Sequence, residues 1–414
     1  MNHPAILRQA LTISASRLIS LSMASTDLMV LGRMAWRDAS DFALASQWAQ
    51  VFVVLAVTLN VGVVLVYRAG RVVDSRLAGR IAAYALAVGG ALCLASLALP
   101  SMAGFSSSAR AIYLVLAAGL VPMTLHIACC HLLEAEGFAP LVLCATAALA
   151  CLNGVLDVVF VACDAVPSGI AVALSTTVVR VAGMVLGCAL VASRLGIRCK
   201  PDWSADTSKA LFGYGRSEAA TGLAFTGGLA LLCTALAAQS GQASFARFGI
   251  ALNFMNTVSI LFTGFSLSLT QYFAKRMPPW QDRVAGVLAL SLVYIVAWIA
   301  VLLPSCGLVA RWYLGRADGA LAGLFAAGLV VVMLDGMAQI LIGLLRLAGQ
   351  VAVPPMFRLS MVVFGIPLSL LGFDGENFGW VMAGLAFGNA VATCLAFSAL
   401  YVTCRRTGAD EQGQ

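Results

Sequence analysis

The stretch LTISASRLISLSMASTDLMVL, residues 11–31, is an apolar run that carries one carboxylate, Asp27. A helix rises about 1.5 Å per residue, so a helix of this length reaches roughly 30 Å, the thickness of the hydrocarbon core of a bilayer. A carboxylate at that depth costs about 2.5–3.5 kcal/mol on insertion scales, unless it faces a bundle interior or a water-filled cavity. The stretch therefore predicts a transmembrane helix whose Asp27 is directed toward the inside of a helix bundle.

The whole chain has the composition of a membrane protein. Its 414 residues are 61% hydrophobic and 10% charged, with a mean hydropathy of +0.95. Apolar segments long enough to cross a bilayer recur from one end of the chain to the other. We therefore predict an all-α fold that spans the membrane many times.

Twelve membrane spans are predicted from these segments. They are residues 11–31, 43–67, 81–99, 111–133, 139–161, 169–193, 211–237, 245–273, 285–309, 320–345, 353–373 and 379–403. With a cytoplasmic N-terminus, most Lys and Arg residues, Arg346 and Arg358 among them, are assigned to the cytoplasmic side. The positive-inside rule then favours cytoplasmic N- and C-termini.

A long polar interruption divides the predicted spans into two sets of six. It is RLGIRCKPDWSADTS, which starts at Arg194 and ends at Ser208. We predict an N-lobe over residues 1–193, a cytoplasmic linker over 194–208 and a C-lobe over 209–414. Because each half holds an even number of spans, the two halves keep the same topology and should be related by an axis along the membrane normal.

Other protein classes fit the sequence less well. The net charge of +7 comes largely from basic residues at membrane ends, where anionic lipid rather than nucleic acid is the expected partner. The twelve cysteines form no matched CxxC pairs, so we expect neither a disulfide framework nor a metal site. No GxxxxGK[ST] loop occurs, which argues against direct use of ATP. We expect a monomer that contacts membrane lipids and small-molecule substrates.

Three polar side chains are predicted to meet inside the first half. Asn153 and Asp157 stand four residues apart, so both lie on one face of the fifth span. Asp157 and Asp27 lie at similar distances from the outer ends of their spans. Two acids and an amide at one depth can share a proton or hold a small cation. The alternative is a hydrogen-bonded cluster that only locks helices together.

Three further positions inside spans deserve separate interpretation. Asp335, near the middle of the tenth span, is either a cavity residue or the structural partner of an arginine. Arg180, in the middle of the sixth span, needs a carboxylate partner or a wet cavity. Pro122, in the fourth span, is the best candidate for local helix bending during transport.

Several short motifs resemble the MATE family, the multidrug and toxic compound extrusion transporters of a wider superfamily of drug, oligosaccharide-lipid and polysaccharide exporters. The run from Thr26 to Gly32 resembles the family's D-T-x-M-x-G pattern, with departures. The run from Ala251 to Asn253 matches its A-L-N motif, and Asp335 precedes Leu345 and Arg346 at the family's spacing. The likeness covers nearly the whole chain.

The resemblance implies a V-shaped pair of six-helix bundles in the bacterial inner membrane, and a transporter rather than an enzyme. It implies export of small amphipathic, often cationic compounds by antiport with H⁺ or Na⁺, with no further cofactor. Coupling would fall to Asp27, Asn153 and Asp157, with Asp335 secondary. Thr226 stands where some relatives carry a seventh-span glutamate. The residues expected to line the substrate cavity are Thr226, Asn253 and Arg180.

Two alternatives remain. A flippase for a lipid-linked oligosaccharide or cell-wall precursor would need several cationic residues in its cavity to hold pyrophosphate, and Arg180 is the obvious one. A membrane-embedded transferase would need a metal-binding acidic motif or a His/Asp pair at a membrane face, and the sequence contains neither.

Overall fold

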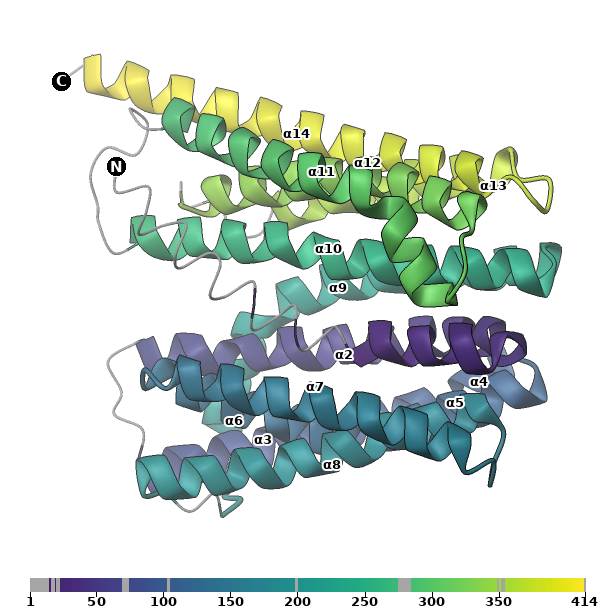
Figure 1. Ribbon diagram of the computed structural model, residues 1–414. Helices are drawn as coiled ribbons and strands as arrows, with labels where there is room; N and C mark the ends of the chain where they lie inside the picture. Colours follow the sequence, from purple (N-terminus) through teal and green to yellow (C-terminus); the bar gives the residue numbers. More distant parts are fainter. Residues whose placement is uncertain are drawn as a thin grey trace. The chain divides into compact units, whose positions relative to one another are not determined.

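The computed structural model describes residues 23–68, 74–102, 105–197, 200–274, 284–347 and 354–412, together with Ala15, Ile19 and Gln350. Nearly all of these residues are helical, and the helices of each part of the chain run side by side (Figure 1). Ten helices in the described part are long and apolar enough to cross a membrane. They coincide with ten of the predicted spans, so the prediction of an all-α membrane fold is confirmed.

The residues Ser22–Ala237 form one compact unit, which we call the first unit. It starts with the helix that contains Asp27, described over residues 23–34. Its other elements are η1 (Trp36–Asp38), α2 (Ala39–Arg68), α3 (Ser75–Leu97), α4 (Leu99–Met102), α5 (Ser107–Ala118), α6 (Leu120–Ala135), α7 (Ala139–Ala162), α8 (Ser168–Leu195) and most of α9 (Ala205–Gln239). Helix α8 packs against α5, α6 and α7, which brings the predicted fifth and sixth spans together.

The second unit includes Ala238–Gln414. Its elements are α10 (Gln242–Ala274), α11 (Val284–Leu314), α12 (Gly319–Leu347), η3 (Pro354–Arg358), η4 (Met361–Gly365), α13 (Ile366–Leu371) and α14 (Phe378–Gln412). Helix α12 packs against α10, α11 and α14 and is the central helix of this unit (Figure 1). The predicted lobe boundaries at residues 193 and 209, and the twofold relation of the lobes, stay predictions.

Capping residues set several helix ends. The Asp74 carboxylate accepts a hydrogen bond from the Leu77 N–H at 2.6 Å and starts α3. The Ser106 hydroxyl oxygen accepts one from the Ala109 N–H at 3.0 Å and starts α5. Helix α8 ends at Leu195. The residue that caps it is Gly196, whose φ of 64° lies in the left-handed region that glycine tolerates best.

The predicted fourth span is broken into two helices. Helix α5 ends at Ala118 with Gly119 as its C-cap, and α6 starts at Leu120. Pro122 lies in the first turn of α6, where its missing N–H is not needed. The Pro122 ring therefore accounts for the interruption, while bending at this residue during transport stays a prediction.

The predicted eleventh span, residues 353–373, is not a regular α-helix. It consists of the 3₁₀ segment η3, the π-helical segment η4 and the short helix α13. Pro354, Pro355 and Pro367 each lack an N–H donor, so a continuous ladder of α-helical hydrogen bonds cannot form through this stretch. As an apolar helix it extends over Met356–Leu371 only.

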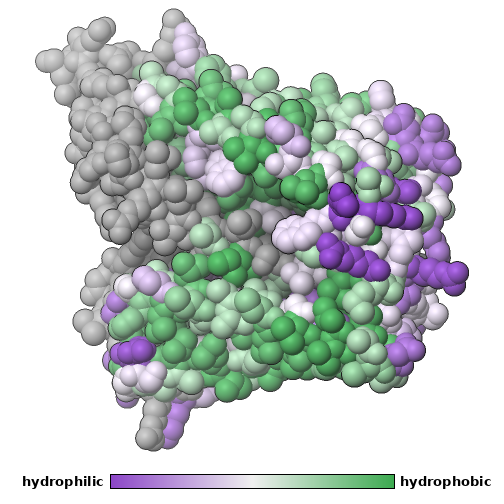
Figure 2. All heavy atoms as spheres, viewed as in Figure 1, coloured by the Kyte–Doolittle hydropathy of each residue, from purple (hydrophilic) through white to green (hydrophobic). Residues whose placement is uncertain are grey.

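Large hydrophobic side chains cover the outside of the helices. Leu94 is 72% exposed, Leu308 71% and Val293 65%. Figure 2 shows hydrophobic residues over much of the face in view, with hydrophilic residues gathered toward the helix ends. Such a surface is the one that a bilayer covers, and the chain is an integral, multi-pass membrane protein. Part of the predicted first span, residues 11–14, 16–18 and 20–22, lies outside the described residues.

Candidate functional site

Asp27, Asn153 and Asp157 meet in the interior of the first unit. Asp27 is 2% exposed, and both Asn153 and Asp157 are fully buried. The Asn153 side-chain nitrogen donates to Asp27 Oδ1 at 2.7 Å and to Asp157 Oδ2 at 3.0 Å. A neutral amide has two N–H hydrogens, so one serves each carboxylate. The structure thus brings together the three residues that the sequence predicts to lie at one depth.

Two hydroxyl groups on α8 complete this arrangement. The Ser175 hydroxyl donates a short hydrogen bond to Asp157 Oδ1, and the Thr176 hydroxyl donates to Asp27 Oδ2 at 3.0 Å. Both residues are buried. We call Asp27, Asn153, Asp157, Ser175 and Thr176 the acidic cluster. The sequence analysis missed both hydroxyls, although the consecutive Ser175, Thr176 and Thr177 in an apolar span were a visible signal.

A close approach of two helices makes the acidic cluster possible. Gly154 on α7 lies next to Asn153, and a Cβ atom added there would lie 3.2 Å from the Thr26 side chain. A larger residue would therefore push the Asp27 helix away from α7. Glycine at position 154 keeps Asp27 within hydrogen-bond distance of Asn153.

One polar atom of the Asn153 side chain has no hydrogen-bond partner in the structure. It is the side-chain oxygen, which is buried. A buried acceptor without a donor is costly, and most such atoms in native proteins are satisfied. Since ionised carboxylates only accept hydrogen bonds, this oxygen can be satisfied by a protonated carboxyl group, by a water molecule or by coordination to a cation.

Arg180 lies beside the acidic cluster and the break between α5 and α6. Its Nη1 donates to the Leu116 carbonyl oxygen at 2.8 Å, and its charge attracts that of Asp27. The side chain also passes over Gly119, where an added Cβ would lie 2.7 Å from Arg180 Cδ. The Leu116 carbonyl group near the helix break thus supplies part of the partnership that the sequence requires for this arginine.

Asp335 has an arginine partner. On α12 its carboxylate lies 2.9 Å from Arg358 Nη2, and the two side chains are 7% and 26% exposed. Of the two interpretations drawn from the sequence, the geometry favours the structural partner of an arginine. Arg358, which the sequence analysis assigned to the cytoplasmic charges, contacts a residue in the middle of a span, and the side of the membrane on which it lies stays a prediction. The irregular η3 segment carries the arginine to this contact.

The remaining predicted residues lie apart from these contacts. Thr226 on α9 is half-buried, and its hydroxyl donates to the Gly222 carbonyl of its own helix at 2.7 Å. Asn253 on α10 is half-buried, and its backbone carbonyl accepts from the Thr257 hydroxyl at 2.9 Å. Their roles in lining a substrate cavity, like that of Arg180, stay predictions.

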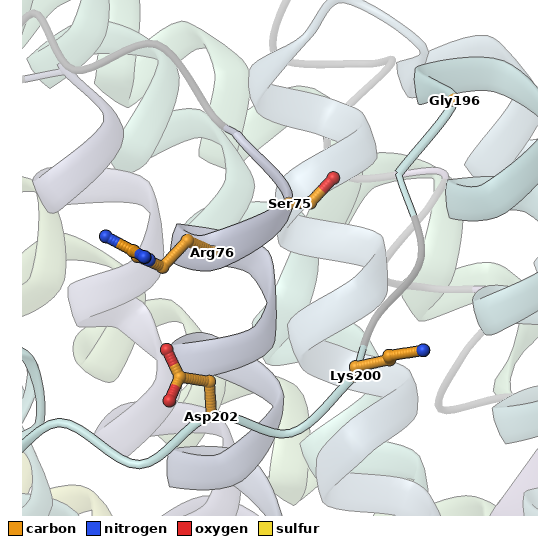
Figure 3. Close-up of a pocket in the computed structure, with 5 residues that line it drawn as sticks. All are labelled: Ser75, Arg76, Gly196, Lys200 and Asp202. Atoms are coloured by element: carbon orange, nitrogen blue, oxygen red, sulfur yellow. The ribbon is translucent and has the colours of Figure 1, made fainter.

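A pocket of about 510 Å³ lies at the start of α3. Its lining includes Ser75, Arg76, Gly196, Lys200 and Asp202. In Figure 3, Arg76 projects from α3, whereas Lys200 and Asp202 come from the segment between α8 and α9. This pocket includes none of the predicted coupling residues. Within the described ranges, no three His, Cys, Asp or Glu side chains are placed to hold a metal ion.

Solved structures with a similar fold cover the whole chain. An outward-facing multidrug resistance MATE family transporter of the MOP superfamily matches with a TM-score of 0.71 at 15% identity, over 100% of this chain and 97% of that one. The chain has the fold of the MATE transporters. The fold that the sequence motifs imply is therefore confirmed.

Two further structures agree with this assignment. An inward-facing MATE transporter of the same superfamily gives a TM-score of 0.71 at 15% identity, covering 100% of this chain and 99% of that one. A MATE structure in complex with Br-NRF gives 0.65 at 16% identity, covering 98% and 96%. No family model and no curated protein sequence matches the chain.

Proposed function

We propose that this protein is a proton-coupled antiporter that exports small amphipathic, often cationic compounds by alternating access. The MATE fold supports transport of this kind, since two similar structures are described as multidrug resistance transporters in outward-facing and inward-facing conformations. The observation that carries the proposal is the acidic cluster, in which two buried carboxylates are joined by one amide inside an apolar helix bundle.

The charges of the acidic cluster support ion coupling over a purely structural role. Two ionised carboxylates in a buried site repel each other, and desolvation disfavours their charged forms. None of the ion pairs in the described part of the chain involves Asp27 or Asp157. A proton or a small cation that enters the acidic cluster would relieve this repulsion, and its departure would restore it.

The donors around the carboxylates favour a proton as the coupling ion. An amide nitrogen and two hydroxyl groups point their hydrogens at the carboxylate oxygens. Each carboxylate oxygen accepts one of these hydrogen bonds, and a sodium ion would have to approach against the positive ends of the N–H and O–H groups that point at these oxygens. A proton needs only one oxygen lone pair and leaves the rest of the hydrogen-bond network in place.

Thr176 links the protonation state of Asp27 to a hydrogen bond between two helices. Its single hydroxyl hydrogen lies within reach of Asp27 Oδ2 at 3.0 Å and of the Val172 carbonyl at 3.2 Å. When Asp27 binds a proton, its new O–H can donate to the Thr176 oxygen, and the threonine hydrogen then turns to Val172. Protonation thereby replaces a charge-assisted contact between the Asp27 helix and α8 by a neutral one, which is weaker.

Transport in reconstituted vesicles tests the proposal. Purified protein in proteoliposomes should move a fluorescent organic cation when a pH gradient is imposed, and not when a Na⁺ gradient alone is imposed. Asp27→Asn and Asp157→Asn should each abolish the pH-driven movement. Asp206→Asn, which changes an exposed acid in the first turn of α9, is the matched control and should transport normally. Full pH-driven transport by both cluster variants would refute the proposal.

The alternative functions gain no support from the contacts. A pyrophosphate-binding flippase needs cationic groups available to its substrate. Arg180 and Arg358 are both engaged by oxygen atoms of the protein itself. An enzymatic role has no motif in the sequence behind it, and the similar structures are of transporters.

A further inference from the structure

Asp335 on α12 is held by four hydrogen bonds from three side chains. Arg358 donates to Oδ1 through Nη2 at 2.9 Å and through Nε at 3.2 Å. Ser259 on α10 donates to Oδ2 at 3.1 Å, and Gln339 on α12 donates to the same oxygen at 2.5 Å. Both oxygens of this buried carboxylate therefore face donors.

The donor that carries charge comes from the least regular part of the second unit. Arg358 is the last residue of the 3₁₀ segment η3, and the π-helical segment η4 follows closely after it. Segments of these two types are less stable than α-helix and often mark places where a backbone rearranges. Asp335 and Ser259, by contrast, lie on the packed helices α12 and α10. The acid is thus fixed, whereas its counter-charge sits on an irregular segment.

The buried acids of the two units have different kinds of partner. In the first unit, amide and hydroxyl groups surround Asp27 and Asp157, which leaves their negative charge uncancelled by an ion pair. In the second unit, the guanidinium of Arg358 cancels the charge of Asp335 directly. Two N–H groups of this guanidinium donate to Asp335 Oδ1, and a carboxylate paired with a guanidinium in this way has no net charge to offer to another cation.

We propose that Arg358 is a tethered cation that fills a cation-binding site made by Asp335, Gln339 and Ser259. Its presence determines specificity, because it keeps the second unit from binding an external monovalent cation at this carboxylate. The consequence for transport rests on the proposed antiport function. The occupancy of the site does not, and it can be measured on purified protein without transport.

A chemical-rescue experiment tests the occupancy. Arg358→Ala removes the guanidinium and leaves a space of matching shape beside Asp335. Low millimolar guanidinium chloride, compared with NaCl at equal ionic strength, should raise the thermal unfolding midpoint of this variant saturably, as expected for a ligand that binds the folded state alone. The wild type, whose site is filled, should show no saturable rise.

The double variant Asp335→Asn/Arg358→Ala is the matched control, because it has the same space without the carboxylate. It should not respond to guanidinium. An equal response of the single and double variants, or no response of the single variant, would overturn the proposal. If Arg358→Ala yields folded protein only when guanidinium is present or Asp335→Asn is added, the proposal is supported. If the double variant also fails to fold, Arg358 serves packing and the proposal is wrong.

A transport arm separates this inference from the proposed function. Arg358→Gln should gain affinity for small guanidinium-containing cations, and Asp335→Asn should remove that gain. If the wild type shows no pH-driven transport, the antiport proposal is refuted. Guanidinium rescue of Arg358→Ala would still support the occupancy of the site. If the wild type transports as proposed but guanidinium does not stabilise Arg358→Ala, the occupancy of the site is refuted and the antiport proposal is not.

Discussion

The Asn153 side-chain nitrogen lies 2.7 Å from Asp27 Oδ1, although the two residues are 126 positions apart in the chain. The same nitrogen also donates to Asp157, one helical turn along α7. One amide thus connects the carboxylates of two helices. Any event that changes the charge of either acid alters the hydrogen bonds that hold the other.

Replacing Asn153 by leucine should uncouple the two acids. The substitution keeps the size of the side chain and removes both donors, so Asp27 and Asp157 each lose a hydrogen bond, worth about 1.5–3 kcal/mol when the acceptor is charged. We expect pH-driven transport to be lost in proteoliposomes and the thermal midpoint to fall. Asn60→Leu is the control, because the buried Asn60 amide donates only to the Ala56 carbonyl of its own helix. Equal transport by the two variants would count against the account.

For pH-driven transport, the hydrogen-bonding capacity of the Thr176 hydroxyl should matter more than the volume of the side chain. Thr176→Val keeps the shape and removes the hydrogen that can turn between Asp27 and Val172. We expect a large loss of pH-driven transport in Thr176→Val and near-normal transport in Thr176→Ser. Thr146→Val is the control, since the buried Thr146 hydroxyl donates to the Val142 carbonyl of its own helix. Transport by Thr176→Val at the rate of Thr146→Val would contradict this role.

Gly119→Ala should destabilise the first unit. The added methyl group would lie 2.7 Å from Arg180 Cδ, so the arginine or the α5–α6 junction has to move. Overpacking of this kind typically costs about 1–3 kcal/mol. Gly227→Ala, on α9, meets no atom within 4 Å and should be neutral or slightly stabilising through higher helix propensity. The thermal midpoints of the two variants in detergent provide the comparison, and similar values for both would be unexpected.

The Asp318 carboxyl, outside the membrane spans, should make stability depend on pH. Burial alone would raise its pKa, but hydrogen bonds from the Leu321 N–H and Arg247 outweigh this and lower the pKa below its ordinary value. A lowered pKa in the folded state gives stability that is fully present above the ordinary pKa and is lost as pH falls through the lowered one. The thermal midpoint of the wild type should thus fall on acidification more than that of Asp318→Asn. Parallel pH profiles would show that this pair contributes nothing.

Much of the fold follows from hydropathy and periodicity. Long apolar segments leave little choice but transmembrane helices, and the spacing of Asn153 and Asp157 places both on one helix face. The predicted eleventh span failed as a regular helix because its prolines remove hydrogen-bond donors, which its hydropathy does not reveal.

The partners of the buried acids were harder to predict. Hydroxyl groups in apolar helices mostly donate to their own backbone, as Thr58 does to Val54. The run of Ser175, Thr176 and Thr177 therefore indicates polar side chains in a span but does not indicate that two of them donate to carboxylates. The pairing of Arg358 with Asp335 depends on the path of an irregular segment across α12. Contacts between helices that are distant in the chain are set by how the helices pack. A single sequence shows that two residues are present but not that they are in contact.

Proton release on substrate binding tests the central claim most directly. Purified protein in weakly buffered detergent solution, with a pH-sensitive dye, should release protons when an organic cation is added. Asp27→Asn and Asp157→Asn should each reduce the release sharply, whereas Asp206→Asn should release as much as the wild type. Undiminished release from the double variant Asp27→Asn/Asp157→Asn would contradict the account, because the protons would then come from groups outside the acidic cluster.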